Sequence, residues 1–170
     1  MIFNPNMKKH WSGKYDDGFE GHELDSTLIE AALKKSLVEG SVFEIGAGTG
    51  YFTKVMESWG YDVSATDLVV GDTMDIARER RGEYDNVVAI GVLHHLLDVD
   101  DHRSALENIK AMARKRIVLA VKLPSSRLKQ RSRHANRYPL TDYTDVLGSP
   151  VTMDVGEYLS VLKWEVDADS

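Results

Sequence analysis

Residues 41–52, S-V-F-E-I-G-A-G-T-G-Y-F, constrain the fold of this chain more than any other segment. A short apolar run that carries one acid, Glu44, leads directly into glycines at alternate positions, Gly46, Gly48 and Gly50, and apolar residues at helical spacing follow. This order indicates a strand, a tight glycine turn and a helix, the arrangement by which an open α/β sheet holds an adenosine-type cofactor at the carboxyl edge of its strands. Glycine suits that turn because a side chain would block the cofactor and because the turn can require positive φ.

The spacing of these glycines differs from the dinucleotide fingerprint G-x-G-x-x-G, whose third glycine would fall where the chain has Tyr51. The pattern is E-x-G-x-G-x-G instead. An acid just before the glycines is unfavourable beside a pyrophosphate and favourable beside a cofactor with a cationic amino-acid end. The string resembles motif I of the class I S-adenosylmethionine-dependent methyltransferases. The alternative is a purely structural turn that binds no ligand.

Composition excludes several other kinds of protein. The 170 residues suggest one domain, and the absence of cysteine excludes disulfides, a thiolate nucleophile and a thiolate metal site. The formal net charge of −6 argues against indiscriminate binding to nucleic acid. No apolar run approaches the length of a membrane span and the amino terminus has no secretion-signal segment, so we expect no membrane association and a cytoplasmic location.

Hydrophobic periodicity predicts a doubly wound α/β fold with a mostly parallel sheet, helices on both faces and an antiparallel C-terminal strand pair. This is also the reduced Rossmann-like fold that the methyltransferase resemblance implies. Expected helices cover about 26–39 (capped by Ser26 and stopped by Gly40), 51–59, 75–81 and 98–116. Expected strands cover 42–45, 62–68, 86–92, 117–123, 151–155 and 158–165. Residues 1–23 look irregular and 124–148 look like a polar loop. We therefore divide the single domain 1–170 into an N-terminal arm and helix (1–40), a cofactor-binding core (41–123), a basic insert (124–148) and terminal strands (149–170).

Further cofactor contacts should lie at the ends of successive strands. Asp67 ends the second strand, about 20 residues after the glycine turn, where a carboxylate can accept hydrogen bonds from both ribose hydroxyls; a turn or capping acid is the alternative. The resemblance implies that Gly71-Asp72 contacts adenine, while Glu44 and the glycines hold the methionine end. The cofactor-binding set that we expect is Glu44, Gly46, Ala47, Gly48, Gly50, Asp67, Leu68, Asp72 and Gly91.

One departure from the family separates the second strand from this adenine pair. Only Leu68, Val69 and Val70 lie between Asp67 and Gly71, where the family has a helix and a third strand. One crossover is therefore shortened or lost. Asp72 could equally cap a helix that starts at Thr73. A missing edge element could also expose a surface for oligomerisation.

Acceptor residues are expected on two other segments. The sequence from Leu93 to Leu96 resembles the L-H-H-L signature that follows the fourth strand of the family, so His94 and His95 are our candidate catalytic residues; structural packing without proton transfer is the alternative. Trp11 and Tyr15 resemble the family's N-terminal lid, or they simply pack the arm against the core. The spacing of the histidines and nearby acids matches no standard metal motif, so we expect no metal site.

A run of basic residues without any acid extends from Lys122 through Leu140. Its Arg127, Arg131 and Arg133 are candidates for binding an anionic acceptor, either a phosphate, a carboxylate or nucleic acid; the alternative is a solvated loop. The sequence thus predicts a methyltransferase that converts S-adenosylmethionine to S-adenosylhomocysteine while methylating a small molecule, for which an anionic acceptor is one candidate. An RNA methyltransferase that uses the insert, and an inactive S-adenosylmethionine-binding partner subunit, remain open alternatives.

Overall fold

The computed structural model describes residues 5–16, 25–124 and 135–166, with side chains from residue 8 to 14 in the first helix. Within these ranges six strands form one sheet in the order β2-β1-β3-β4-β6-β5. The first four strands are parallel, and β6 pairs antiparallel with β4 and with β5. Their bounds are β1 Ser41–Ile45, β2 Asp62–Thr66, β3 Tyr84–Ile90, β4 Ala113–Val121, β5 Thr152–Val155 and β6 Ser160–Glu165. The expected doubly wound fold with an antiparallel C-terminal pair is confirmed.

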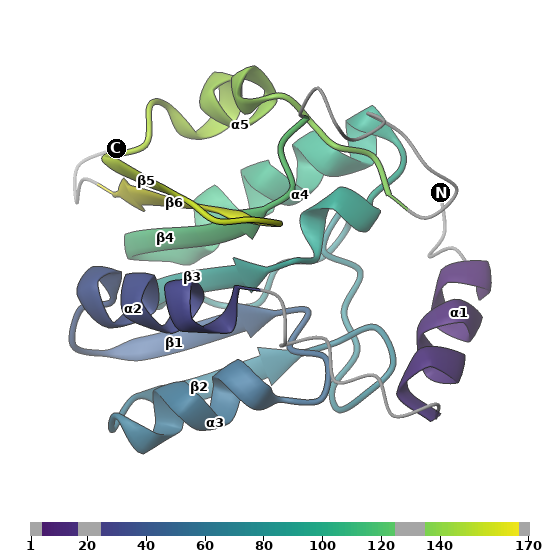
Figure 1. Cartoon of the computed structure of the whole chain (residues 1–170), viewed down its shortest axis with the longest axis horizontal. Coiled ribbons are helices and arrows are strands. Elements are labelled where there is room, and N and C mark those ends of the chain that lie inside the picture. Colours follow the sequence, from purple (N-terminus) through teal and green to yellow (C-terminus); the bar gives the residue numbers. More distant parts are fainter. Residues whose placement is uncertain (1–4, 17–24, 125–134, 167–170) are drawn as a thin grey trace.

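Helices cover both faces of this sheet (Figure 1). The bounds are α1 Pro5–Asp16, α2 Ser26–Ser36, α3 Tyr51–Ser58, α4 Val99–Met112 and α5 Leu140–Leu147, with a 3₁₀ turn, η1, at Leu93–His95. α2 and α3 lie on one face, and α4 and α5 lie on the other, while α1 lies beyond the carboxyl ends of β1 and β2. None of the described helices has both the length and the apolar character needed to cross a membrane.

The central strands are buried on both faces, as expected for a parallel sheet between two helical layers. Along β1, Val42 faces the core beneath α2 and α3, whereas Phe43 and Ile45 face the core beneath α4. The same alternation places Val88 in the first core and Val87 in the second. This arrangement fixes the register and brings the carboxyl ends of β1, β2, β3 and β4 to one edge of the sheet.

One predicted helix is wrong, and another is present but ends earlier than expected. Residues 75–81 form only a single turn, in which the Asp75 carbonyl accepts from Arg78 and Glu79; the neighbouring Ile76 carbonyl instead accepts from the Asn108 side chain on α4. The helix expected over 98–116 ends at Met112, and Ala113–Val121 forms β4. Residues 113–116 pair with β3 instead of continuing the helix, so a tertiary contact overrides the local helical periodicity there.

Two segments expected to be irregular contain helices. Residues 5–16 form α1, and Leu140–Leu147 form α5 inside the predicted polar loop. Pro139 stands at the N-cap of α5, and Tyr143 is fully buried against α4, so one aromatic anchor stabilises a short helix that periodicity alone did not reveal. Residues 125–134 of that loop lie outside the described residues.

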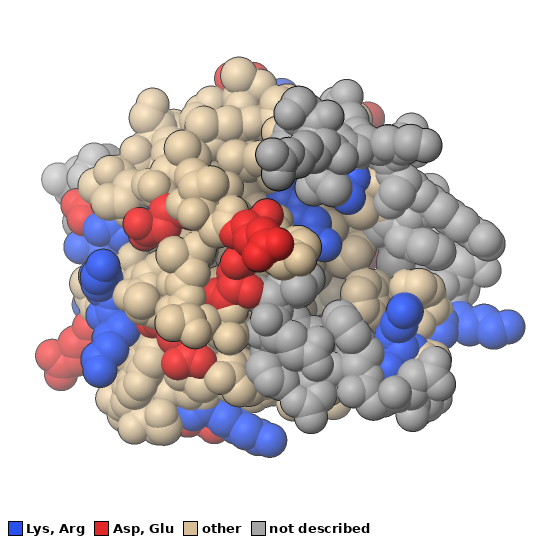
Figure 2. Space-filling view, in the orientation of Figure 1, with Lys and Arg blue, Asp and Glu red and all other residues tan. Residues whose placement is uncertain are grey.

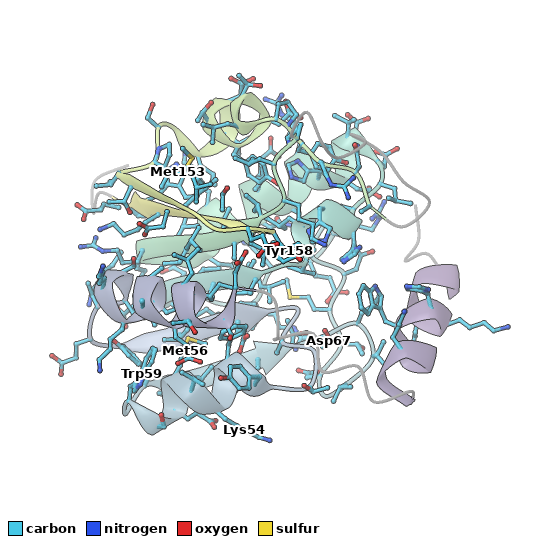
Figure 3. All side chains as sticks on the ribbon, viewed as in Figure 1. Lys54, Met56, Trp59, Asp67, Met153 and Tyr158 are labelled. Atoms are coloured by element: carbon cyan, nitrogen blue, oxygen red, sulfur yellow. The ribbon has the colours of Figure 1, made fainter. Side chains whose placement is uncertain are left out.

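The predicted cap of α2 is also wrong. Asp25, not Ser26, is the N-cap, and it has φ of 58° and makes no side-chain capping bond. Its carboxylate instead accepts the backbone N–H groups of Glu157, Tyr158 and Leu159 at 3.2, 2.8 and 2.8 Å, which fixes the turn between β5 and β6 to the start of α2. Tyr158 marks this turn in Figure 3. α2 ends at Ser36, before Gly40.

We expect Asp25→Ala to lower the free energy of unfolding by about 1–3 kcal/mol, because three N–H groups lose a charged acceptor. Asp25→Asn keeps one carbonyl oxygen and tolerates positive φ, so its effect should be smaller. The measurement is urea denaturation at neutral pH. Asp145→Ala, an exposed aspartate on α5, is the control and should change stability by less than about 0.5 kcal/mol. Equal losses for Asp25→Ala and Asp145→Ala would contradict this account of the turn.

Candidate active site at the carboxyl edge of the sheet

The glycine turn between β1 and α3 is fastened to the end of β2. The N–H groups of Gly46 and Ala47 both donate to the Thr66 carbonyl, at 2.8 and 3.0 Å. Gly46, Gly48 and Gly50 have φ of 71°, 58° and 83°, so the expected positive φ is confirmed at all three glycines. A Cβ on Gly46 would lie 2.6 Å from the Val92 side chain. The turn is therefore restricted to glycine by conformation and, at Gly46, also by space.

Glu44 is buried directly beneath this turn, with 1% of its surface exposed. Its carboxylate accepts a 2.5 Å hydrogen bond from the Thr53 hydroxyl on α3. Burial raises the pKa of Glu44 to about 7, the Thr53 hydrogen bond opposes the rise, and the charges of Asp67 and Glu57 add to it. An acid with a raised pKa destabilises the fold as pH rises from its unfolded pKa of about 4.3 towards 7. Glu44 is therefore only partly ionised near neutral pH, and a cation bound beside it would favour its charged form.

Asp67 lies beside the same turn and is 8% exposed. One carboxylate oxygen accepts the Gly48 N–H at 3.0 Å, and the other accepts the N–H groups of Val69 and Val70 at 2.9 and 3.3 Å. Figure 3 shows Asp67 at the end of the sheet that faces α1. The half-buried Leu68 follows directly. Asp67 thus joins the end of β2 to the glycine turn of β1, which sequence analysis did not anticipate.

The adenine candidate Asp72 has a different environment. Its side chain is 71% exposed and pairs with the Arg81 guanidinium. Its backbone forms a single parallel bridge with Thr66, its carbonyl accepts from the Asp67 N–H at 3.3 Å, and the Thr66 hydroxyl also donates to that carbonyl. No helix begins after Asp72 in the described residues up to β3, so the capping alternative is excluded. The backbone of Asp72 occupies the place beside β2 that a third strand would take.

The two histidines follow β3. Gly91, with φ of 65°, donates its N–H to the Ala120 carbonyl at 2.8 Å and turns the chain into η1. His94 is 1% exposed, and its Nδ1 has no hydrogen-bond partner in the described structure. Burial lowers the pKa of His94 well below its ordinary value, and the charges of His95, Lys122 and Arg137 lower it further. His94 is therefore neutral at physiological pH.

His95 connects η1 to the N-terminal helix. Its ring lies 4.1 Å from the His94 ring and 4.9 Å, edge to face, from the indole of Trp11. Tyr15 also belongs to α1, although its side chain is outside the described part. The contact between Trp11 and His95 joins α1 to the segment that follows β3.

The structure brings together most of the predicted site. The glycine turn, Glu44 and Asp67 meet at the ends of β1 and β2, and His94, His95 and Trp11 meet beyond β3. Arg127, Arg131 and Arg133 lie outside the described residues. Thr53 was missed, although its position one turn into the helix after the glycines could have suggested a hydroxyl directed back at Glu44.

Comparison with known proteins identifies the class. A family model described as a methyltransferase domain matches residues 18–149, so the chain belongs to that family, and its fold is that of the class I S-adenosylmethionine-dependent methyltransferases. Among curated protein sequences, none matches significantly.

Solved structures show the same fold. One is the 1,6-didemethyltoxoflavin-N1-methyltransferase of Burkholderia thailandensis with bound 1,6-didemethyltoxoflavin and S-adenosylhomocysteine. It superposes with a TM-score of 0.71 at 18% identity, over 97% of this chain and 91% of that one. The magnesium protoporphyrin IX methyltransferase of Synechocystis PCC 6803, solved with S-adenosylhomocysteine, gives 0.68 at 19% identity, over 83% and 81%. An S-adenosylmethionine-dependent methyltransferase of Methanosarcina mazei gives 0.63 at 12% identity, over 79% and 96%.

We expect Gly46→Ala to destabilise the protein by about 2–4 kcal/mol, because it adds positive-φ strain to a clash with Val92. In a Val92→Gly background the clashing Cβ and both methyl groups of residue 92 are removed, and the remaining cost of Gly46→Ala should be about 1–2 kcal/mol. Gly82→Ala is the control for strain alone, since φ is 57° and the nearest contact of a Cβ would be an ordinary 3.8 Å. Denaturant unfolding of the four variants forms the test, and an equal cost of Gly46→Ala in both backgrounds would refute the clash.

Proposed function

We propose that this chain transfers a methyl group from S-adenosylmethionine to a small-molecule acceptor. The observation that carries the proposal is the buried Glu44 carboxylate beneath three positive-φ glycines, with Asp67 beside them. When bound, S-adenosylmethionine supplies an electrophilic methyl group on a sulfonium centre, so the protein needs mainly to align the acceptor.

The residues at this edge fit such a cofactor. Glu44 has a raised pKa because it is buried and lies near other acids, and the ammonium of a methionine end would compensate its charge. The glycine turn leaves backbone accessible where side chains would block a ligand. In this proposal Gly46, Ala47, Gly48 and Gly50 hold the methionine end together with Glu44.

Asp67 and Leu68 are proposed to hold the ribose. A carboxylate offers about four lone-pair positions, and the Asp67 carboxylate already accepts three backbone N–H groups. It can accept one ribose hydroxyl directly, and a second would compete with the long contact from Val70 at 3.3 Å. Asp72 is proposed near adenine, where its backbone, fixed by the bridge to Thr66, is better placed than its ion-paired side chain. Gly91 is proposed to line the site at the end of β3.

His94, His95, Trp11 and Tyr15 are proposed to form the acceptor side. His95 is half-buried and is the better candidate for accepting a proton from the acceptor, because His94 is sealed from solvent and neutral. The indole of Trp11 contacts His95, so α1 can exclude water from the acceptor. In this proposal residues 1–170 act as a single domain.

No observation in the described residues favours RNA as the substrate. The arginines of the insert lie outside the described part, and Figure 2 shows Lys and Arg side chains at several separate places on the face that it displays. We therefore retain only the small-molecule proposal.

The test of the proposed function combines ligand binding with methyl transfer. Calorimetric titration should show binding of S-adenosylhomocysteine, and Glu44→Gln should weaken it by about 10–100-fold, which is the worth of a hydrogen bond to a charged group. Labelled S-adenosylmethionine should then transfer label to a component of a small-molecule extract. Stabilisation by NAD without S-adenosylhomocysteine binding would reject the proposal, and binding without any transfer would favour the inactive partner.

A pH dependence follows from Glu44. Its pKa of about 7 in the free protein should fall when an ammonium binds, so binding releases a proton below that pH. The affinity for S-adenosylhomocysteine should therefore rise with pH up to about 7, by at most about tenfold per pH unit, and then level off. Calorimetry in buffers with different ionisation enthalpies counts the released protons. Glu44→Gln should abolish the dependence; if the variant keeps it, another group is responsible.

A further inference from the structure

Three separate chain segments converge beyond β3 and β4, each with a basic side chain. His94 comes from η1, Lys122 directly follows β4, and Arg137 follows the insert. The Asn136 N–H donates to the His94 carbonyl at 2.7 Å, which holds the segment before Arg137 against η1. After Arg137, the Tyr138 hydroxyl donates to the Leu96 carbonyl at 2.7 Å, so hydrogen bonds hold the chain on both sides of Arg137. This convergence is therefore built by the fold.

Lys122 is the least compensated member of this group. It is half-buried, and no hydrogen bond or ion pair joins its ammonium to another part of the described structure. Lys163, in contrast, pairs with Glu165 at 3.5 Å and Lys115 pairs with Asp85 at 2.9 Å. In a chain of net charge −6, a half-buried lysine without an acid is unusual, because burial of an uncompensated cation is unfavourable.

The charges near Lys122 reinforce one another. Burial lowers the pKa of Lys122, and the charge of Arg137 lowers it further. The same Arg137, together with Lys122 and His95, acts on His94. A negatively charged group placed beside Lys122 and Arg137 would relieve the repulsion between these two cations and partly replace the hydration that Lys122 loses by burial.

We propose that Lys122, with Arg137 beside it, binds a negatively charged oxygen group, a carboxylate or phosphate, of the methyl acceptor. This inference rests on the proposed function and defines its substrate class. It also assigns anion binding to the carboxyl edge itself, next to His95 and Trp11, where a bound acceptor would be held close to the proposed methionine end. Arg127, Arg131 and Arg133 are not needed for it.

The experiment uses the full chain saturated with S-adenosylhomocysteine and titrated with inorganic phosphate and with benzoate at constant ionic strength. Both anions should bind in the millimolar range and raise Tm, whereas neutral benzamide should not. Lys122→Gln should weaken anion binding by about tenfold, the worth of one charged hydrogen bond, and Lys122→Arg should restore most of it. Lys35→Gln, an exposed lysine on α2, should change nothing.

The outcomes separate this proposal from the proposed function. Normal S-adenosylhomocysteine binding without any binding of phosphate or benzoate overturns the anionic acceptor and leaves the methyltransferase proposal intact. Weaker S-adenosylhomocysteine binding in folded Lys122→Gln would also overturn it, because Lys122 would then hold the carboxylate of the cofactor. Failure of the wild type to bind S-adenosylhomocysteine rejects the proposed function instead. The Tm of each variant without ligand shows whether it is folded.

Discussion

The attachment of the glycine turn to the end of β2 is the contact on which the rest of the edge depends. Two N–H groups of the turn share the Thr66 carbonyl, and a third, from Gly48, is held by Asp67. These bonds set the height of the turn above Glu44 and the direction in which α3 leaves it. Because the donors are backbone groups, the bonds themselves do not depend on the side chains of the turn. The turn nevertheless requires glycine, because other residues rarely adopt the positive φ values of Gly46, Gly48 and Gly50.

Acidic and basic side chains lie at opposite ends of this carboxyl edge, and this separation determines which ligand charges each end can bind. Acids lie at the ends of β1 and β2, where burial and the nearby charge of Asp67 raise the pKa of Glu44. Bases lie beyond β3 and β4, where His94 and Lys122 are buried to different degrees. A cofactor with a cationic group near the end of β1 and an acceptor with an anionic group near the end of β4 would together compensate the charges of both groups. The separation itself comes from the strand order, since β1 and β3 are neighbours and β4 lies one strand further away.

Sequence reasoning recovered what short-range chemistry encodes. The apolar runs and the glycine turn predicted the strands and α3 correctly, because periodicity and turn chemistry act over a few residues. The predictions failed where contacts between residues far apart in the sequence determine the structure. α4 ends at Met112 because the following residues pair with β3. The N-cap of α2 is Asp25 and not Ser26, and the Asp25 carboxylate binds a turn more than a hundred positions away. The position of Lys122 beside His94 depends in the same way on β3 and β4 being adjacent, which no local pattern shows.

The shortened crossover explains how a reduced version of this fold can keep its site. Where the family resemblance implies a helix and a strand after β2, this chain instead buries Met74 and Ile76 against the core on the α4 side. The single bridge between Thr66 and Asp72 covers the outer edge of β2 at one residue. The carbonyl of that same residue, Thr66, accepts the hydrogen bonds from the glycine turn. Since Asp67 is fixed by its own loop as well as by Gly48, the geometry beside the turn does not require a third strand. The segment between β2 and β3 therefore makes the contacts that position the carboxyl edge without forming a helix or a further strand of its own.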